Sequence, residues 1–410
     1  MRSVEEHQQV IAGLVQARPA VTRAPGDALG MVLAADVVAE LSLPGFDNSA
    51  MDGFAALATD IAAASADDPV TLPVTDDIPA GRTDTRPLKP GTAQRIMTGA
   101  PLPPGATTVV PVESTDADFT APYSTGAEQV QIRAATRDGQ HIRRAGEDVA
   151  AGTTVLRAGQ LLTPAALGLV AALGLAEVSV LPRPRVLVMS TGSELVAPGV
   201  PLLPGQIYES NAVMLAAAVR DAGADVVTSS MTEDDVDLFR AELQRHARDA
   251  DLVITTGGVS AGAYEVVKDS LADEVEFVKV AMQPGMPQGS GVVAGTPIVT
   301  LPGNPVSALV SFEVFIREPL RAAMGIPHPG RPHLSATLAE TVTSPKGRRQ
   351  FRRGVLGAVE DGSGTTTVTS YGPPASHHLR WLASANCLLE IDEDVTELPA
   401  GSPVQVWDLS

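Results

Sequence analysis

Four short apolar runs in the middle of the chain constrain its fold more than any other feature. They are RVLVMS at 185–190, ADVVTS at 224–229, DLVITT at 251–256 and TPIVTL at 296–301, and turn and helix patterns follow them. Unbroken Val/Ile/Leu runs are typical of strands that are buried on both faces. Because parallel strands need right-handed helical crossovers, the pattern predicts a doubly wound α/β domain over 184–328.

Two helix patterns lie in the first half of the chain. Residues 4–16 place apolar side chains at helical spacing, and 161–183 are rich in Ala and Leu, with a start signal at Thr163-Pro164. We expect these two helices to pack together. They would then belong to one discontinuous N-terminal domain, made of residues 1–40 and 147–183.

The remaining segments are typical of β structure. Residues 41–146 contain short Val/Thr/Ile runs broken by Pro and Gly, which predicts an inserted β-rich domain. Residues 329–410 alternate apolar and polar side chains, which predicts a small C-terminal β domain. A length of 410 residues, at roughly 150 residues per domain, fits several domains.

The charge balance disfavours polyanionic partners. The chain has 29 Lys and Arg against 48 Asp and Glu, a net charge of −19, so neither nucleic acid nor an anionic membrane is expected to bind it. Its single cysteine, Cys387, cannot form an internal disulfide, which fits a reducing compartment and predicts a cytoplasmic protein. We find no signal-peptide core and no apolar stretch of about 18 residues.

Three glycine-containing turns follow strands of the predicted sheet. They are STGSEL at 190–195, TTGGVSAG at 255–262 and LPGNPVSAL at 301–309. Such turns expose backbone N–H groups at the carboxyl ends of parallel strands, where ligands bind, so together they predict a phosphate-like ligand. Each turn taken alone is more typical of a tight strand-to-helix connection. None matches a dinucleotide-binding or P-loop motif.

Acidic side chains accompany these turns. Glu194 and Glu265 follow two of them, and Asp234 with Asp235 follows the strand at 224–229. Mg²⁺ prefers one or two carboxylates together with phosphate oxygens, so the set predicts a magnesium site. The alternative for Asp234 and Asp235 is helix capping, since Thr232 and Asp235 have the spacing of a capping box.

Other catalytic classes lack support. The histidines have no zinc spacing, and His377 and His378 are adjacent. Ser193 and Ser260 lie in loops without the G-x-S-x-G pattern of a nucleophile elbow. Two basic clusters, HIRRAGED at 141–148 and KGRRQFRRG at 346–354, are candidate anion receptors, although either could be a solvated surface turn.

Seven motifs, in order, resemble those of one enzyme family over essentially the whole chain. They are DNSAMDGFA at 47–55, MTGAPLPPGATTVVPVE at 97–113, RRAGEDV at 143–149, STGSEL, GQIYESNAVML at 205–215, TTGGVSAG and LPGNPVSALVSFEVF. The family is that of the molybdopterin molybdenumtransferases, MoeA in bacteria, which includes the E domain of gephyrin. The resemblance implies a four-part subunit whose last domain is a β barrel.

The resemblance also implies an activity and an assembly. The family takes adenylylated molybdopterin and molybdate, cleaves the phosphoanhydride with Mg²⁺, and leaves molybdenum on the dithiolene with release of AMP. It implies a homodimer in which the β-rich domain of one subunit faces the α/β domain of the other, so that the active site is shared. A protein that delivers the adenylylated pterin is a further expected partner.

Site residues are carried over by motif. The resemblance implies catalytic roles for Asp52, Thr98, Arg143, Asp148, Glu194 and Glu265, and places Mg²⁺ on Glu194, one of Asp234 or Asp235, and Glu265. Ser307 and the helix amides would donate hydrogen bonds to the anion. The residues expected to bind the pterin nucleotide and the oxyanion are Thr191, Gly192, Ser193, Gly257, Gly258, Ser260, Pro302, Gly303, Asn304, Pro305, Val306, Ser307, Arg348, Arg353 and Ser376.

The chain departs from the family pattern at the anion site. Gln283 and Met286 stand where the family usually has lysines, and Glu265 stands where it usually has aspartate. Loss of two ammonium groups weakens oxyanion binding, because charge-assisted hydrogen bonds are about twice as strong as neutral ones. An alternative function is therefore a catalytically weak paralogue that binds the pterin or acts as a scaffold. The magnesium set, which a pure binder does not need, favours the enzyme.

Overall fold

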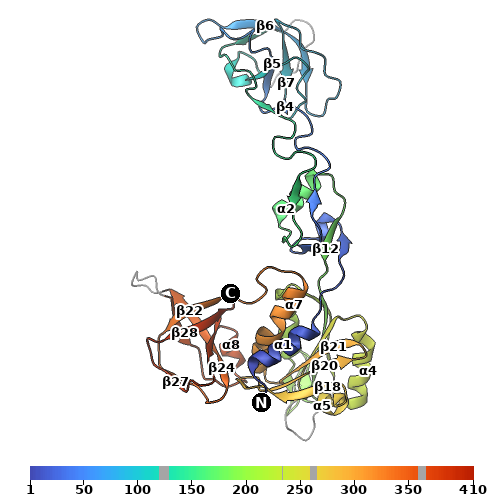
Figure 1. The fold of residues 1–410 in the computed structure, drawn as a ribbon, viewed down its shortest axis with the longest axis vertical. Coiled ribbons are helices and arrows are strands. Elements are labelled where there is room, and N and C mark those ends of the chain that lie inside the picture. Colours follow the sequence, from blue (N-terminus) through green and yellow to red (C-terminus); the bar gives the residue numbers. More distant parts are fainter. Residues whose placement is uncertain (120–128, 233, 259–265, 359–365) are drawn as a thin grey trace. The chain divides into compact units, whose positions relative to one another are not determined.

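The computed structural model describes residues 1–119, 129–232, 234–258, 266–358 and 366–410 (Figure 1). The chain forms two compact units. The larger unit contains Met1–Ala34, Gly159–Thr163 and Ser179–Ser410, and the smaller unit contains Ala35–Ala158 and Pro164–Val178.

A six-stranded sheet forms the centre of the larger unit, with all four predicted runs as its parallel strands. Their order is β16 (Asp225–Thr232), β13 (Arg185–Thr191), β17 (Leu252–Thr256) and β21 (Thr296–Leu301). Two antiparallel strands, β20 (Pro287–Val293) and β18 (Val275–Lys279), extend the sheet beyond β21. The sequence analysis missed β20 because Gly and Ser occupy its middle. A Cβ on Gly291 would lie 2.1 Å from the Glu274 carbonyl oxygen, so only glycine fits there.

Helices connect and cover the strands. They are α3 (Asn211–Asp221), α4 (Val236–Ala247), α5 (Val266–Leu271), and a continuous helical stretch made of α6 (Pro305–Ser311), the π-helix η3 (Phe312–Ile316) and α7 (Arg317–Ala323). The capping box predicted from Thr232 is wrong, because Thr232 still belongs to β16. Asp235 alone caps α4 and accepts a hydrogen bond from the Leu238 N–H at 2.9 Å.

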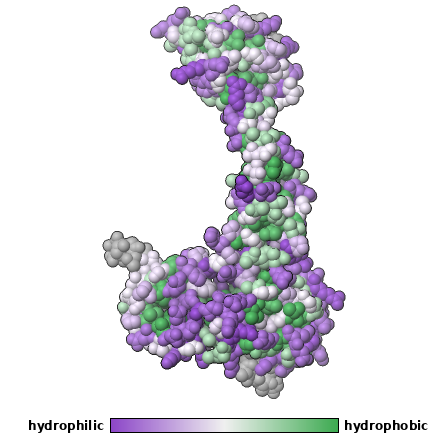
Figure 2. All heavy atoms as spheres, in the orientation of Figure 1, coloured by the Kyte–Doolittle hydropathy of each residue, from purple (hydrophilic) through white to green (hydrophobic). Residues whose placement is uncertain are grey.

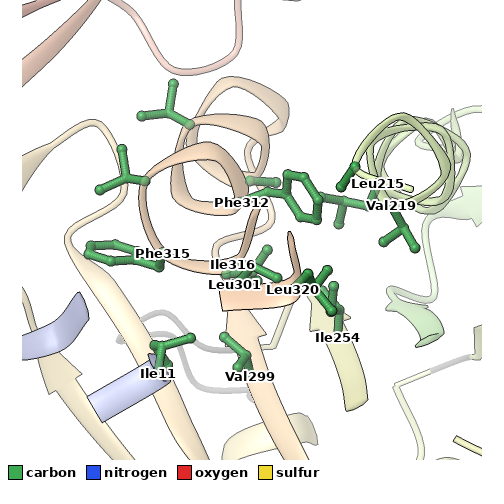
Figure 3. Close-up of a cluster of buried hydrophobic side chains, with 14 of the residues drawn as sticks. Ile11, Leu215, Val219, Ile254, Val299, Leu301, Phe312, Phe315, Ile316 and Leu320 are labelled. Carbon is green, nitrogen blue, oxygen red and sulfur yellow. The ribbon is translucent and has the colours of Figure 1, made fainter. Parts of the chain in front are cut away.

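The main core of the larger unit lies between the sheet and the helices α3, α6, η3 and α7, whereas α4 and α5 pack in a second cluster. Figure 3 shows Phe312 pointing toward Leu215 and Val219 of α3. The opening helix α1 (Val4–Leu14) also packs here, with His7 edge-on to Phe315 at 4.7 Å between ring centroids. The pairing of α1 with the helix at 161–183 stays a prediction. That helix, α2 (Pro164–Ala172), belongs to the smaller unit.

A closed β barrel ends the chain, as expected. Its five strands are β24 (Arg349–Ala358), β25 (Thr366–Ser370), β22 (His333–Leu338), β28 (Pro403–Asp408) and β26 (Cys387–Ile391), closed by pairing of β26 with β24. The short strand β19 (Met282–Gln283) pairs with β24, so a segment of the α/β region joins the barrel.

Minor elements of the larger unit are β1 (Val21–Arg23), β2 (Val32–Leu33), β12 (Val178–Leu181), β14 (Leu195–Val196), β15 (Ile207–Tyr208), β23 (Val342–Thr343), β27 (Glu397–Leu398) and α8 (Leu379–Leu382).

The smaller unit is rich in β structure, as the composition of 41–146 predicts. Its five-stranded sheet has the order β8 (Thr108–Pro111), β5 (Gly53–Ala56), β7 (Ala93–Ile96), β6 (Val70–Ile78) and β9 (Gln129–Ile132). Two strand pairs accompany it: β10 (Ile142–Arg143) with β4 (Asn48–Ser49), and β11 (Thr154–Leu156) with β3 (Val37–Val38).

The visible surface is largely hydrophilic (Figure 2). In the face shown in Figure 2, hydrophilic side chains are spread over both units, with smaller apolar areas among them. In the parts of the chain that the structure describes, no helix combines the length and the apolar character needed to cross a bilayer.

Candidate functional site

A cavity of about 990 Å³ lies in the larger unit, between the carboxyl ends of the parallel strands and the C-terminal barrel. It has lining residues from all three glycine turns and from the barrel segments at 348 and 374–379. The predicted site residues that line it are Thr191, Gly192, Glu194, Asp234, Gly257, Gly258, Pro302, Gly303, Asn304, Pro305, Ser307, Arg348 and Ser376.

The three turns pack against one another on one side of this cavity. Gly257 has φ +93°, and a Cβ there would lie 2.5 Å from the Thr191 carbonyl oxygen. The Asn211 side-chain amide, at the start of α3, donates to the Gly303 carbonyl at 2.6 Å and to the Thr256 hydroxyl at 3.2 Å. The backbone of the cavity wall is therefore fixed by contacts between turns that are far apart in sequence.

We expect Gly257→Ala to lower the free energy of unfolding by about 2–4 kcal/mol, because it adds a backbone clash to the strain of a positive φ. Chemical denaturation measures the change. Gly199→Ala is the matched control, since Gly199 has φ +92° and open space around its Cβ position. Equal losses in the two variants would contradict the role given to the Thr191 contact.

The acidic residues differ in their surroundings. The Glu194 carboxylate is exposed and lies over Gly192, where an added Cβ would be 2.8 Å from Oε2. Asp234 accepts from the Ser193 N–H at 3.0 Å, and its own N–H donates to the Ser193 hydroxyl at 3.0 Å. Asp234 therefore belongs to the first turn and lines the cavity. Asp235 and Ser193 are absent from its lining.

Only part of the predicted magnesium site lies within the described residues. Within the described ranges, no three His, Cys, Asp or Glu side chains are grouped closely enough to hold a metal ion. Two predicted residues, Ser260 and Glu265, lie outside the described residues. Glu194 and Asp234 are thus the described carboxylates of the predicted magnesium set that line the cavity.

On the barrel side, Arg348 and Ser376 line the cavity, but Arg353 does not. Arg353 is 4% exposed, and its guanidinium donates to the carbonyl oxygens of Pro373, Ala375 and His378. It holds the loop that carries Ser376. The Val306 amide is also occupied, since it donates to the Ser376 carbonyl at 3.1 Å.

The sequence analysis gave no role to Glu209, Asn211 and His377, which also line the cavity. Glu209 is 6% exposed and accepts from the Ala212 N–H at 2.7 Å, near the start of α3. Its signal was present in the motif GQIYESN, where an acid lies two residues before the helix α3. His377 carried no signal beyond its position after Ser376.

Four predicted site residues lie in the smaller unit. Asp52 accepts hydrogen bonds from the Thr98 N–H at 2.7 Å and the Thr98 hydroxyl at 2.8 Å, and these lower the pKa of Asp52. Arg143 pairs in register with Asn48, four residues before Asp52. The Asp148 N–H donates to the Leu43 carbonyl at 3.1 Å.

The two arginines of the RRAGED motif are not equivalent. Arg144 forms an ion pair with Asp47 at 2.6 Å, whereas none of the ion pairs among the described residues involves Arg143. Hydrogen bonds from the Ala145 N–H and from Arg144 lower the pKa of Asp47. Arg143 is therefore the arginine of this motif that stays available for a ligand.

The fold and the cavity together define a ligand-binding α/β protein in which a β barrel closes one side of the site. Sequence models of three families match consecutive parts of the chain: the MoeA N-terminal region, domains I and II, at 2–174, a probable molybdopterin-binding domain at 187–322, and the MoeA C-terminal region, domain IV, at 335–409. The chain belongs to the MoeA family of molybdopterin molybdenumtransferases.

Individual relatives support this membership over the full length. Molybdopterin molybdenumtransferase 2 of Mycobacterium tuberculosis is 64% identical, with all of both chains covered. Molybdopterin molybdenumtransferase 1 of the same organism is 38% identical over 99% of this chain and 98% of its own. The crystal structure of a molybdopterin biosynthesis MoeA protein from Pyrococcus horikoshii is 28% identical, with a TM-score of 0.78 over 100% of this chain and 99% of its own.

Proposed function

We propose that this chain is a molybdopterin molybdenumtransferase, which inserts molybdenum from molybdate into adenylylated molybdopterin and releases AMP. The observation that carries the proposal is the cavity of about 990 Å³, which has room for a pterin nucleotide beside an oxyanion. It combines glycine turns and carboxylates from the strand ends with Arg348 and Ser376 from the barrel. The name of the 64% identical relative supports the same activity.

On the sheet side, we assign Glu194 and Asp234 to Mg²⁺. Both have the hard oxygen ligands that Mg²⁺ prefers, and two carboxylates suffice where phosphate oxygens and water complete the shell. When bound, Mg²⁺ neutralises charge on the phosphoanhydride whose P–O bond breaks as AMP leaves. Asp234 keeps its place through Ser193, and the capping role of Asp235 supports Asp234 as the functional member of the pair.

We assign Arg348 and Ser376 from the barrel side, and Ser307 from the third glycine turn, to molybdate. Arg348 supplies charge, and the two hydroxyls supply neutral hydrogen bonds. Arg353 acts indirectly, because its bonds to carbonyl oxygens hold the loop around Ser376. Gln283 and Met286 line the same cavity without charge.

The family assembly extends this proposal. We propose a homodimer in the cytoplasm in which Asp52, Thr98, Arg143 and Asp148 of one subunit complete the cavity of the other, and a separate protein delivers the adenylylated pterin. The proposed domain division is 1–40 with 147–183, 41–146, 184–328 and 329–410. The Asp52–Thr98 pair and the available Arg143 support a polar ligand surface on the smaller unit.

The direct test incubates purified protein with adenylylated molybdopterin, molybdate and Mg²⁺. We expect AMP to appear and molybdenum to become bound to the pterin, with both products lost when Mg²⁺ is chelated. AMP is quantified by chromatography, and bound molybdenum by mass spectrometry. AMP at the level of a protein-free control would contradict the proposal.

The neutral residues Gln283 and Met286 favour one competing function. In it, the chain is a paralogue that binds the pterin nucleotide without converting it to product. The same experiment separates the two functions. Retention of intact adenylylated pterin on the protein, without AMP release, would favour the binding protein.

A further inference from the structure

The charges around the cavity leave few partners for an oxyanion. Among the described lining residues, only Arg348 and His377 can carry positive charge, whereas Glu194, Glu209 and Asp234 are acidic. A dianion that enters this site therefore meets a surplus of negative charge. A further positively charged side chain on the barrel side of the cavity would therefore strengthen binding of the dianion.

The backbone on both sides of His377 is held in place. The Ser376 carbonyl accepts from the Val306 N–H at 3.1 Å, which ties this segment to the third glycine turn. Arg353 donates to the carbonyls of Ala375 at 3.2 Å and His378 at 3.1 Å. The His377 carbonyl accepts from the Leu379 N–H at 3.0 Å. The chain thus presents His377 from a fixed position next to Ser376.

The side chain of His377 itself is exposed and lines the cavity. Its ring packs edge-on against His378, at 4.3 Å between centroids. Arg353 lies beneath the segment, bonded to its carbonyls, and Arg380 lies over the Trp381 ring. None of the ion pairs among the described residues joins His377 to a carboxylate, so its imidazole is available to a ligand.

We propose that His377 is an anion-binding residue of this chain, whose protonated imidazole donates to the oxyanion beside Ser376 and Arg348. It supplies positive charge in a cavity where Gln283 and Met286 supply none. The inference rests on the proposed function only for the identity of the anion as molybdate. The imidazole donates charge to the oxyanion only while it is protonated, so oxyanion binding should weaken once that proton is lost at higher pH.

The test measures binding of molybdate and of sulfate by titration calorimetry at about pH 5.5 and at about pH 8. Sulfate keeps its double negative charge throughout this range. We expect wild-type protein to bind sulfate about tenfold more weakly at the higher pH, the size of one charge-assisted hydrogen bond. His377→Gln should show the weak affinity at both values. His377→Lys should show the tight affinity at both.

His378→Gln is the matched control, because it removes the neighbouring histidine, which does not line the cavity. It should keep the pH dependence of the wild type, and circular dichroism verifies that each variant is folded. Equal affinity of His377→Gln and wild type at the lower pH would overturn the inference while AMP release by the wild type still stands. Absence of AMP release with the pH dependence intact would instead overturn the proposed function.

Discussion

Glu194→Gln should lower the rate of AMP release by about two to three orders of magnitude, the usual cost of removing one preorganised group that stabilises charge in a transition state. The Glu194 carboxylate lines the cavity and lies over Gly192 in the first turn. Glutamine keeps its size but removes the charge that would hold Mg²⁺. Single-turnover release of AMP from adenylylated molybdopterin, with molybdate and Mg²⁺ present, gives the rate.

Two comparisons make this result specific to Glu194. Asp237→Asn is the matched control, because Asp237 is an exposed acid on the first turn of α4 that does not line the cavity; it should leave the rate within about twofold of wild type, as expected for a surface substitution. Raising the Mg²⁺ concentration should restore part of the Glu194→Gln rate, since the variant binds the ion more weakly. A Glu194→Gln rate equal to that of wild type would remove this carboxylate from the mechanism.

The local pattern was sufficient to predict the parallel strands. The four unbroken apolar runs correspond to β16, β13, β17 and β21. Such runs are easy to recognise because a strand that is covered on both faces has no polar side chains between its apolar ones. The glycine turns were found for a related reason. Close approach of Gly257 to Thr191 excludes any other residue, and that requirement is visible in the sequence before the contact itself is known.

What the sequence could not reveal depends on long-range packing. Arg353 belongs to a basic cluster in sequence, yet only the fold shows that backbone carbonyls occupy its guanidinium. The sequence also could not reveal the packing partner of α1, because an apolar helix face fits more than one partner. In the structure, the apolar face of α1 packs against η3. Glu209 and His377 line the cavity from segments far apart in the sequence, and only Glu209 lies within a motif.

Restoring the family lysines tests the anion side of the cavity. Gln283→Lys combined with Met286→Lys should strengthen molybdate binding by about ten- to a hundredfold, because two ammonium groups add charge-assisted hydrogen bonds worth about 1.5–3 kcal/mol before desolvation is subtracted. Gln283, Met286 and Arg348 line the same cavity, so the new charges would enter the site that already contains Arg348. Calorimetric titration with molybdate measures the gain.

The backbone should tolerate both substitutions, since the hydrogen bond at Met286 comes from the Val280 N–H to its carbonyl oxygen and involves no side chain. Val292→Lys with Leu238→Lys is the control for net charge alone, because both positions are exposed, at 46% and 55%, and lie outside the cavity. It should change molybdate affinity by less than about twofold, as salt screens charges at a distance. Unchanged molybdate affinity in a folded Gln283→Lys, Met286→Lys variant would show that the oxyanion does not bind beside these residues. A gain confined to that variant would show that the neutral pair lowers the affinity of this cavity for molybdate, which Arg348, His377, Ser376 and Ser307 then bind.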